Sequence, residues 1–214
     1  MKNSKYQERT YLASESVCFK KTKEAFGGLS NMAAGFLLQI NDVPILTSEA
    51  LYQCCRFPHL PDLQKLIIAE KSPMTAKMLI KPYKEQSRKD FDESKVDIMR
   101  WCLRVKLAQN FIEFGNLLLS TNNQAIVEDS VKDTFWGAVR DKNDDNILRG
   151  INALGRLLME LRKKYTENPF APQLFYIEPP KIANFKLLGQ EIGIVDERTN
   201  FLNTLAKKFS QTNT

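Results

Sequence analysis

The sequence predicts a mainly helical α+β domain that carries a small antiparallel β-sheet near its N-terminus. The longest apolar periodicity runs over 94–114, on a stripe from Val96 to Phe111, and indicates a central helix. A second long helix is expected over 152–165. Short apolar runs bounded by turn residues in the first fifty residues predict the strands of the sheet.

The N-terminal elements follow from local composition. Residues 1–16 are polar and are expected to form a flexible N-terminus. Strands are predicted over 16–20, 36–40 and 45–47. Asn41–Pro44 supplies turn residues, so the last two strands should pair as a hairpin.

A helix is predicted to begin after Thr47 or Ser48, either of which can act as the N-cap, and to continue through Phe57. Glu49 therefore lies in the first turn of this helix. Proline lacks a backbone N–H and fits the first helical position. We therefore expect Pro58 and Pro61 to end this helix and Pro73 to open a later one. The remaining helices are predicted over 63–70, 73–78 and 201–209.

Composition limits the class of protein. With 214 residues and 43% hydrophobic content, the chain is expected to form one core domain, 17–165, with a C-terminal extension, 166–214, packed on it. A net charge of +6 favours an anionic partner. No apolar run reaches the length of a membrane span or a signal sequence, so we expect a cytoplasmic protein without membrane contact. The four cysteines and His59 lack zinc-site spacing, which predicts no metal.

A first candidate site is the segment Asp133–Gly137, followed by Asn152 and Gly155. It combines a carboxylate, an indole and a glycine that lets a planar ligand approach Trp136, and stacking on an aromatic ring contributes roughly 1–3 kcal/mol per base. Asn152 and Gly155 share one side of the following helix. The alternative is structural, with Trp136 in the core and Gly155 at a helix-packing contact.

A second candidate site combines the turn Gly27–Asn31 with Glu49. Backbone N–H groups of a glycine-rich turn can hold phosphate, and Ser30 and Asn31 add donors suited to ribose or phosphate oxygens. The alternative is that the glycines serve only the turn. For Glu49 the alternative is a favourable charge at a helix N-terminus, worth about 0.3–1 kcal/mol.

These motifs occur in one order along the chain, from about Phe19 to Arg162. That order is made by Phe26–Asn31, Thr47–Glu49, Tyr52–Phe57, Ser72–Pro73, Met99–Arg100, Lys106, Trp136–Gly137 and Asn152–Arg162. The set resembles the NADAR or YbiA-like family. This resemblance implies a mostly helical fold with a small sheet and cleavage of N-glycosidic bonds of ribose derivatives. One branch of that family acts on riboflavin-pathway intermediates, and another removes ADP-ribose from guanine and is paired with DarT-type ADP-ribosyltransferase toxins.

The chain departs from the family pattern at several positions. Ala50 stands where a histidine usually follows the glutamate, Arg56 replaces a lysine, and Phe91 replaces the tryptophan of an Arg-x-x-Trp element. Lys20, Lys21 and Lys23 precede the glycine turn. These lysines and the sequence of residues Phe26–Met32 resemble the toxin-associated branch more closely. The resemblance then implies three partners, namely ADP-ribosylated guanine in DNA, the product ADP-ribose and a DarT-type toxin.

Cleavage of a ribosyl C–N bond needs proton transfer to the leaving base, stabilisation of an oxocarbenium-like centre and an activated nucleophile. We predict that Glu49 and Asp133 divide these roles without a cofactor. A second route uses a lysine amine that forms an imine with the ribose, with Lys20 as the candidate, although Lys20 could equally be a solvated surface residue. The predicted substrate-binding residues are Gly28, Ser30, Asn31, Arg56, Phe91, Trp136, Gly137 and Asn152.

Three other functions stay open at this point. The chain could hydrolyse phosphoribosylated riboflavin-pathway intermediates by the same chemistry. It could also bind ADP-ribose without turnover, or neutralise a toxin by docking through residues 169–214.

Overall fold

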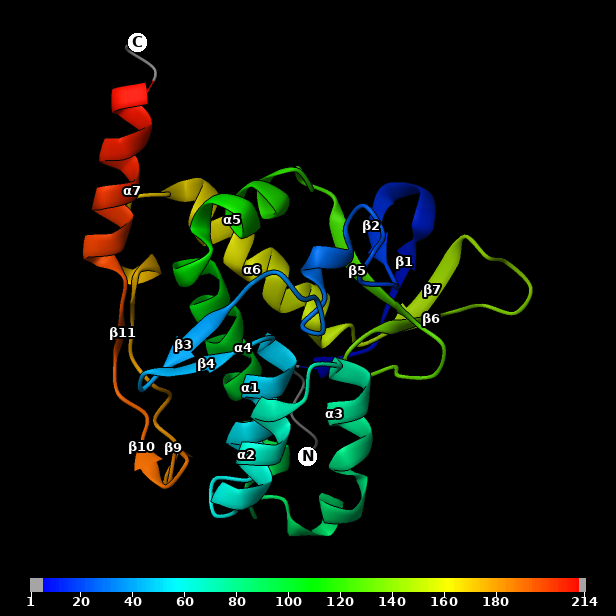
Figure 1. Ribbon diagram of the computed structural model, residues 1–214. Coiled ribbons are helices and arrows are strands. Elements are labelled where there is room, and N and C mark those ends of the chain that lie inside the picture. The colour runs from blue at the N-terminus through cyan, green and yellow to red at the C-terminus, as the bar shows by residue number, and fades with distance from the viewer. Residues whose placement is uncertain (1–5, 212–214) are drawn as a thin grey trace.

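The computed structural model describes residues 6–211 and shows an α+β fold in which helices pack against a mixed sheet (Figure 1). The predicted fold class is confirmed. The sheet lies at one side of the molecule, and the C-terminal segment runs along the opposite side of the helices. In the described part of the chain no helix is long and apolar enough to cross a membrane.

The main sheet differs from the prediction. Its five strands have the order β1–β7–β6–β5–β2, in which β2 and β6 run parallel to β5 and the other pairs are antiparallel. Residues 125–150, which the sequence analysis did not identify as strands, supply three of them. Strands β5 and β7 pair with residues more than 100 positions away, and β6 is only three residues long, so the local signal is weak. The strands are β1 (Arg9–Leu12), β2 (Ser16–Phe19), β5 (Ala125–Ser130), β6 (Ala138–Arg140) and β7 (Ile147–Gly150).

Strand β1 also corrects the expected flexible N-terminus. Its residues pair with β7 from Arg9 opposite Gly150 to Leu12 opposite Ile147. Tyr11 is buried there in a small second core with Leu148. Residues 1–5 of the same expectation lie outside the described residues.

The predicted hairpin is confirmed as a separate two-stranded ribbon, β3 (Leu38–Ile40) and β4 (Val43–Ile45). Asn41 and Asp42 both have positive φ, 48° and 61°, as a two-residue turn of this kind requires.

The helices form most of the core. The predicted helix 94–114 is two helices, because Asn110 leaves helical geometry with a φ of −133°. Helix α4 contributes the buried stripe that the periodicity predicted, including Met99, Leu103 and Leu107. The helices before the extension are α1 (Ser48–Arg56), α2 (Pro61–Ala69), α3 (Pro73–Leu79), α4 (Phe91–Gln109), α5 (Phe111–Leu119) and α6 (Ala153–Glu167), with short 3-10 turns η2 (Ala13–Glu15), η3 (Gly27–Leu29) and η4 (Lys81–Gln86).

The described part of the C-terminal extension packs on the helices. Phe175 stacks on Phe201 with ring centroids 3.8 Å apart, and both contact Phe111 of α5. The predicted closing helix falls within α7. The elements of this segment are η5 (Pro172–Leu174), β8 (Tyr176–Ile177), β9 (Lys186–Leu187), β10 (Gln190–Glu191), β11 (Val195–Asp196) and α7 (Arg198–Gln211).

Candidate active site

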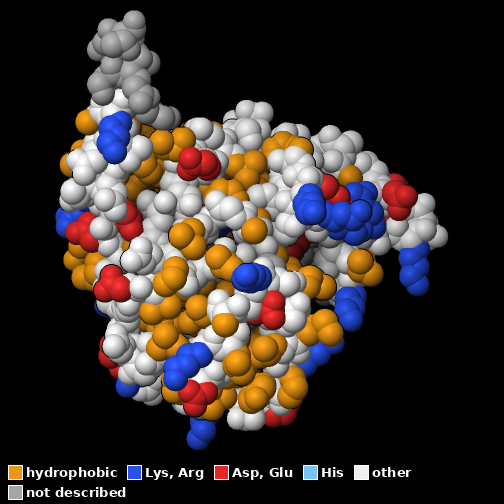
Figure 2. Space-filling view, in the orientation of Figure 1, with side chains coloured by type: hydrophobic (Ala, Val, Ile, Leu, Met, Phe, Trp, Pro, Cys, Tyr) orange, Lys and Arg blue, Asp and Glu red, His pale blue; other side chains and the backbone are white. Residues whose placement is uncertain are grey.

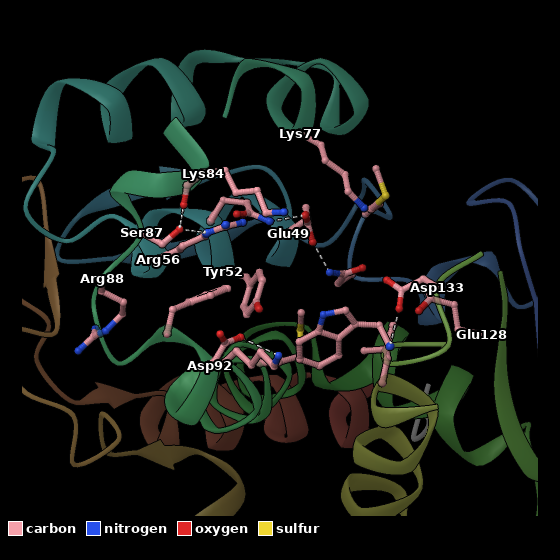
Figure 3. A pocket seen from close by; sticks show the side chains of 18 of the residues that line it. Glu49, Tyr52, Arg56, Lys77, Lys84, Ser87, Arg88, Asp92, Glu128 and Asp133 are labelled. Carbon is pink, nitrogen blue, oxygen red and sulfur yellow. Dashed lines mark hydrogen bonds and ion pairs between the residues drawn. The ribbon is translucent and has the colours of Figure 1, made fainter. Parts of the chain in front are cut away.

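A cavity of about 710 Å³ opens where α1, α3 and the start of α4 meet the loops that follow β2 and β5 (Figure 3). Helix α1 presents Glu49, Tyr52 and Arg56 to it, because residues separated by three, four and seven positions share one face of a helix. The predicted site residues that line the cavity are Asn31, Glu49, Arg56, Phe91, Asp133 and Trp136.

Glu49 is held in a fixed position in the first turn of α1. Thr47 is the N-cap of this helix, and its Oγ1 accepts the N–H of Ala50 at 3.2 Å. The Glu49 side chain is buried; Oε2 accepts a hydrogen bond from Asn31 Nδ2, and Oε1 accepts one from Gln53 Nε2 at 2.8 Å. Both neighbours donate, so the two carboxylate oxygens of Glu49 are held in place at the cavity.

Glu128 is the site residue that sequence reasoning missed. It comes from β5 and lies beside Asp133 at the wall of the cavity that faces Glu49 (Figure 3). Burial, and then the charges of Asp133 and Glu49, raise the pKa of Glu128 to about 7, while Lys77 partly opposes them. A carboxyl with such a pKa is protonated at neutral pH often enough to act as an acid. The sequence feature that could have indicated Glu128 is its position directly after the apolar residues 126–127.

Asp133 shapes the loop that follows β5. Its Oδ1 accepts the N–H groups of Phe135 at 3.0 Å and Trp136 at 2.9 Å. These two bonds turn the chain and place Trp136 against the cavity, where its ring meets the edge of Tyr52 at a centroid distance of 5.7 Å. Asp133 thus lines the cavity, raises the pKa of Glu128 and positions the indole.

Trp136 is partly buried against the core and also lines the cavity. We expect Trp136→Ala to weaken binding of a ligand with a planar base, because an aromatic stacking contact is worth roughly 1–3 kcal/mol, or about 5- to 150-fold in affinity. Isothermal titration calorimetry measures the loss of binding, and thermal melting measures any loss of core packing. The matched control is Phe135→Ala, which removes a ring that packs on Trp136 at 5.1 Å but does not line the cavity. Normal binding by a Trp136→Ala protein that melts far lower would assign the indole to packing alone.

A cationic wall stands opposite the carboxylates. Arg56 Nε donates to Ser87 Oγ at 2.7 Å, and its guanidinium lies 4.5 Å from the ring centroid of Phe91. Lys84 and Lys89 line the same side. Phe91 is therefore a support for Arg56 as well as part of the cavity wall.

The glycine turn does not form the predicted phosphate cradle. Its backbone N–H groups at Gly27, Leu29 and Ser30 are bonded within the turn. The carbonyls of Gly28 and Ser30 accept hydrogen bonds from the buried Lys106 Nζ at 2.7 and 3.0 Å. Burial lowers the pKa of Lys106 to about 7. Of this turn only Asn31 lines the cavity, and Met32, which follows the turn, lines it as well.

Asn152 and Gly137 also lie outside the cavity lining. Asn152 is fully buried with a φ of 52°; its Nδ2 donates to the Ile126 carbonyl at 2.8 Å and its Oδ1 accepts the N–H of Glu128 at 3.2 Å. A Cβ at Gly137 would lie 2.5 Å from the Glu128 carbonyl, and one at Gly155 would lie 2.0 Å from the Ile126 carbonyl. These residues allow close packing around β5 and so position Glu128.

Lys20 does not lie where its predicted role as the imine-forming amine requires. Its Nζ lies 3.5 Å from Asp129 Oδ1, and the side chain does not line the cavity. Strand alternation explains this, since Asp129 and Glu128 point to opposite faces of β5. Lys77 of α3 instead extends toward the carboxylates (Figure 3). Among residues 6–211 no group of three or more potential ligand side chains could hold a metal ion.

A buried carboxylate facing a half-buried one, with an indole and a cationic wall, in an α+β domain fits an enzyme that cleaves glycosidic bonds. The chain belongs to the NADAR family: residues 18–166 match the NADAR domain.

Its relatives include proteins named as N-glycosidases. N-glycosidase YbiA of Escherichia coli (strain K12) is 32% identical over 146 residues, which cover 68% of this chain and 86% of YbiA. The NMR structure of the E. coli protein YbiA has a TM-score of 0.60 and 28% identity, and covers 73% of this chain and 89% of that one.

Two further relatives are named riboflavin biosynthesis proteins. The one from Vibrio vulnificus (strain YJ016) is 27% identical over 194 residues, 91% of this chain. The chloroplastic one from Zea mays is 31% identical over 161 residues, 69% of this chain. The aligned region spans 50% of the Vibrio relative and 25% of the maize relative.

Proposed function

We propose that this chain is an N-glycosidase that removes ADP-ribose from guanine bases in nucleic acid and thereby acts as the antitoxin of a DarT-type ADP-ribosyltransferase. The observation that carries the proposal is the pair Glu49 and Glu128. Glu49 accepts hydrogen bonds from two donors, while burial and neighbouring charges raise the pKa of Glu128 to about 7. A cavity with an acid and a base of this kind supports turnover rather than binding alone.

In this reaction Glu128 gives its proton to a nitrogen of the departing guanine as the C1′–N bond breaks. Glu49 stabilises the positive charge that develops on the ribose and takes a proton from the water that attacks C1′. The products are guanine in the nucleic acid and free ADP-ribose. Asp133 keeps Glu128 protonated through its negative charge.

The cations of the opposite wall suit the diphosphate of ADP-ribose. They are Arg56, Lys84 and Lys89, whereas Arg88 and Lys95 are ion-paired with Asp90 and Asp92. Basic side chains also gather on the surface near β1 and β2, and the exposed lysines Lys20, Lys21 and Lys23 follow β2 (Figure 2). Such a surface favours a polyanionic substrate.

The direct test uses purified protein and an oligonucleotide that carries ADP-ribosylated guanine. Mass spectrometry should detect free ADP-ribose and the unmodified oligonucleotide. The second candidate function is hydrolysis of a phosphoribosylated riboflavin-pathway intermediate, which the names of two relatives favour. Turnover of that compound with none of the oligonucleotide would assign this second function. Binding of ADP-ribose without turnover of either compound would make the chain a binding module.

The antitoxin role is tested by co-expression with a DarT-type toxin. Wild-type protein should restore growth, and the Glu49→Gln variant should not, because removal of the modification needs catalysis. Rescue by the variant would instead support neutralisation by docking. That docking was the alternative predicted for residues 169–214.

The lysine route gives a separate prediction. Because water is the nucleophile in the reaction above, borohydride added during turnover should trap no adduct at Lys20. If an imine forms instead, its amine must reach the anomeric carbon, and Lys77 is the lysine placed to do so. Peptide mapping by mass spectrometry locates the adduct. Lys77→Arg keeps the charge and should abolish trapping. An adduct at Lys20 would contradict the placement, and turnover without any adduct would assign the nucleophile to water.

A further inference from the structure

The C-terminal extension lies outside the NADAR match, yet it contacts the cavity wall from behind. The contact runs through the segment 183–188, which we name the brace. Arg88, on the cavity wall, is 7% exposed, and its Nη2 donates to the Ala183 carbonyl at 2.6 Å. The same guanidinium binds both carboxylate oxygens of Asp90, at 2.6 and 3.0 Å. Asp90 is the N-cap residue of α4, so the brace is fastened to the start of that helix.

The brace is fastened to α1 as well. Gln64 is fully buried; its Nε2 donates to the Cys54 carbonyl at 2.9 Å and to the Lys186 carbonyl at 3.0 Å. Its Oε1 accepts the N–H of Leu188 at 2.6 Å. One amide thus ties the last turn of α1 to the brace.

The two helix ends held in this way carry the cationic wall. Arg56 is the last residue of α1 and Phe91 is the first of α4. They meet at 4.5 Å, and the Arg88 N–H donates to the Arg56 carbonyl at 3.0 Å. The brace also packs on α4 through Phe185, whose ring lies edge-on to Trp101 at 5.0 Å.

We propose that the brace, acting through Arg88 and Gln64, positions Arg56 and Phe91 for substrate binding. Arg88 and Gln64 are positioning residues in this scheme. Glu128 lies across the cavity from Arg56, and Glu49, two turns before Arg56 on α1, is held by Asn31 and Gln53. The brace should therefore govern substrate affinity and leave the chemical step unchanged. The proposal rests on the proposed function only for the choice of substrate.

The test strains the brace without altering a residue that lines the site cavity. Asn184 follows Ala183 and has a φ of 52°, which a β-branched residue adopts only under strain. Asn184→Val should displace the Ala183 carbonyl, raise KM for the ADP-ribosylated oligonucleotide roughly tenfold and leave kcat within about twofold, because a small misplacement of a binding group is costly. Asn184→Gly accepts the same φ and should match wild type.

A second control applies the same strain elsewhere. Asn122 has a φ of 48° at the end of α5 and touches neither the brace nor the cavity wall, so Asn122→Val should lower Tm while KM stays unchanged. Equal KM changes in Asn122→Val and Asn184→Val would overturn the proposal, as would a wild-type KM in Asn184→Val.

Hydrogen exchange gives a readout that does not depend on the substrate. Asn184→Val should speed exchange at the amides of Arg88 and Phe91, which bond to the Arg56 and Arg88 carbonyls, and Asn122→Val should not. Wild-type exchange at both amides in Asn184→Val would overturn the proposal. If wild-type protein hydrolyses no substrate, the proposed function fails, and the exchange data alone decide whether the brace holds the wall.

Discussion

Glu49→Gln should lower kcat by roughly 10²–10⁴-fold, the usual cost of losing a positioned acid or base. The amide keeps the shape of the side chain but can neither carry the negative charge that stabilises the ribosyl cation nor accept a proton from water. Single-turnover measurement of ADP-ribose release gives the rate of the chemical step. A near-wild-type single-turnover rate would remove Glu49 from the chemistry.

The matched control for this variant is Glu93→Gln. Glu93 is also in the first turn of a long helix, but it is exposed and does not line the cavity. Both substitutions remove a favourable charge at a helix N-terminus, worth about 0.3–1 kcal/mol. Only Glu49→Gln should change the rate.

Glu128→Gln should also reduce kcat by roughly 10²–10⁴-fold, because the departing base loses its proton donor. In the wild-type protein kcat/KM should fall as pH rises through about 7, where Glu128 loses its proton. The residual activity of the Glu128→Gln variant should not show this decrease with rising pH. A wild-type rate that stays constant from pH 6 to 9 would contradict the role of Glu128 as the acid.

Glu128→Gln should raise the stability of the folded protein at alkaline pH, although it lowers activity. The pKa of Glu128 is about 7 in the folded protein and about 4.5 in the unfolded chain, so the folded state holds more protons between these values. The contribution of Glu128 is therefore fully present below pH 4.5 and is lost as pH rises through 7. At pH 8 the Glu128→Gln variant should be more stable than wild type, by an amount on the order of 1–3 kcal/mol. Denaturant unfolding at pH 5 and pH 8 measures the difference.

Asp129→Asn is the control for the second variant. Asp129 neighbours Glu128 in β5 but pairs with Arg140 at 2.7 Å and does not line the cavity. Its substitution should lower stability and leave the chemical step intact. The reverse pattern in Glu128→Gln, with activity lost and stability gained at pH 8, would distinguish a catalytic acid from a structural one.

The sequence by itself determined the elements whose interactions are local. The N-cap Thr47 and the turn residues Asn41 and Asp42 act within a few positions, so both α1 and the hairpin could be predicted. Helical spacing similarly predicted the buried stripe of α4. The pattern of a carboxylate, an indole and a glycine identified Asp133 and Trp136 as site candidates, and the resemblance to the NADAR family added Arg56 and Phe91.

Only the tertiary structure decided the rest of the site. Glu128 becomes an acid because burial and the charges of Asp133 and Glu49 raise its pKa, and these charges come from the loop after β5 and from helix α1. Lys20 lost its predicted role because strand pairing places it beside Asp129, and Asn152 bonds to the backbone of β5. Desolvation, strand register and long-range hydrogen bonds depend on residues far apart in the chain, and no local pattern encodes them.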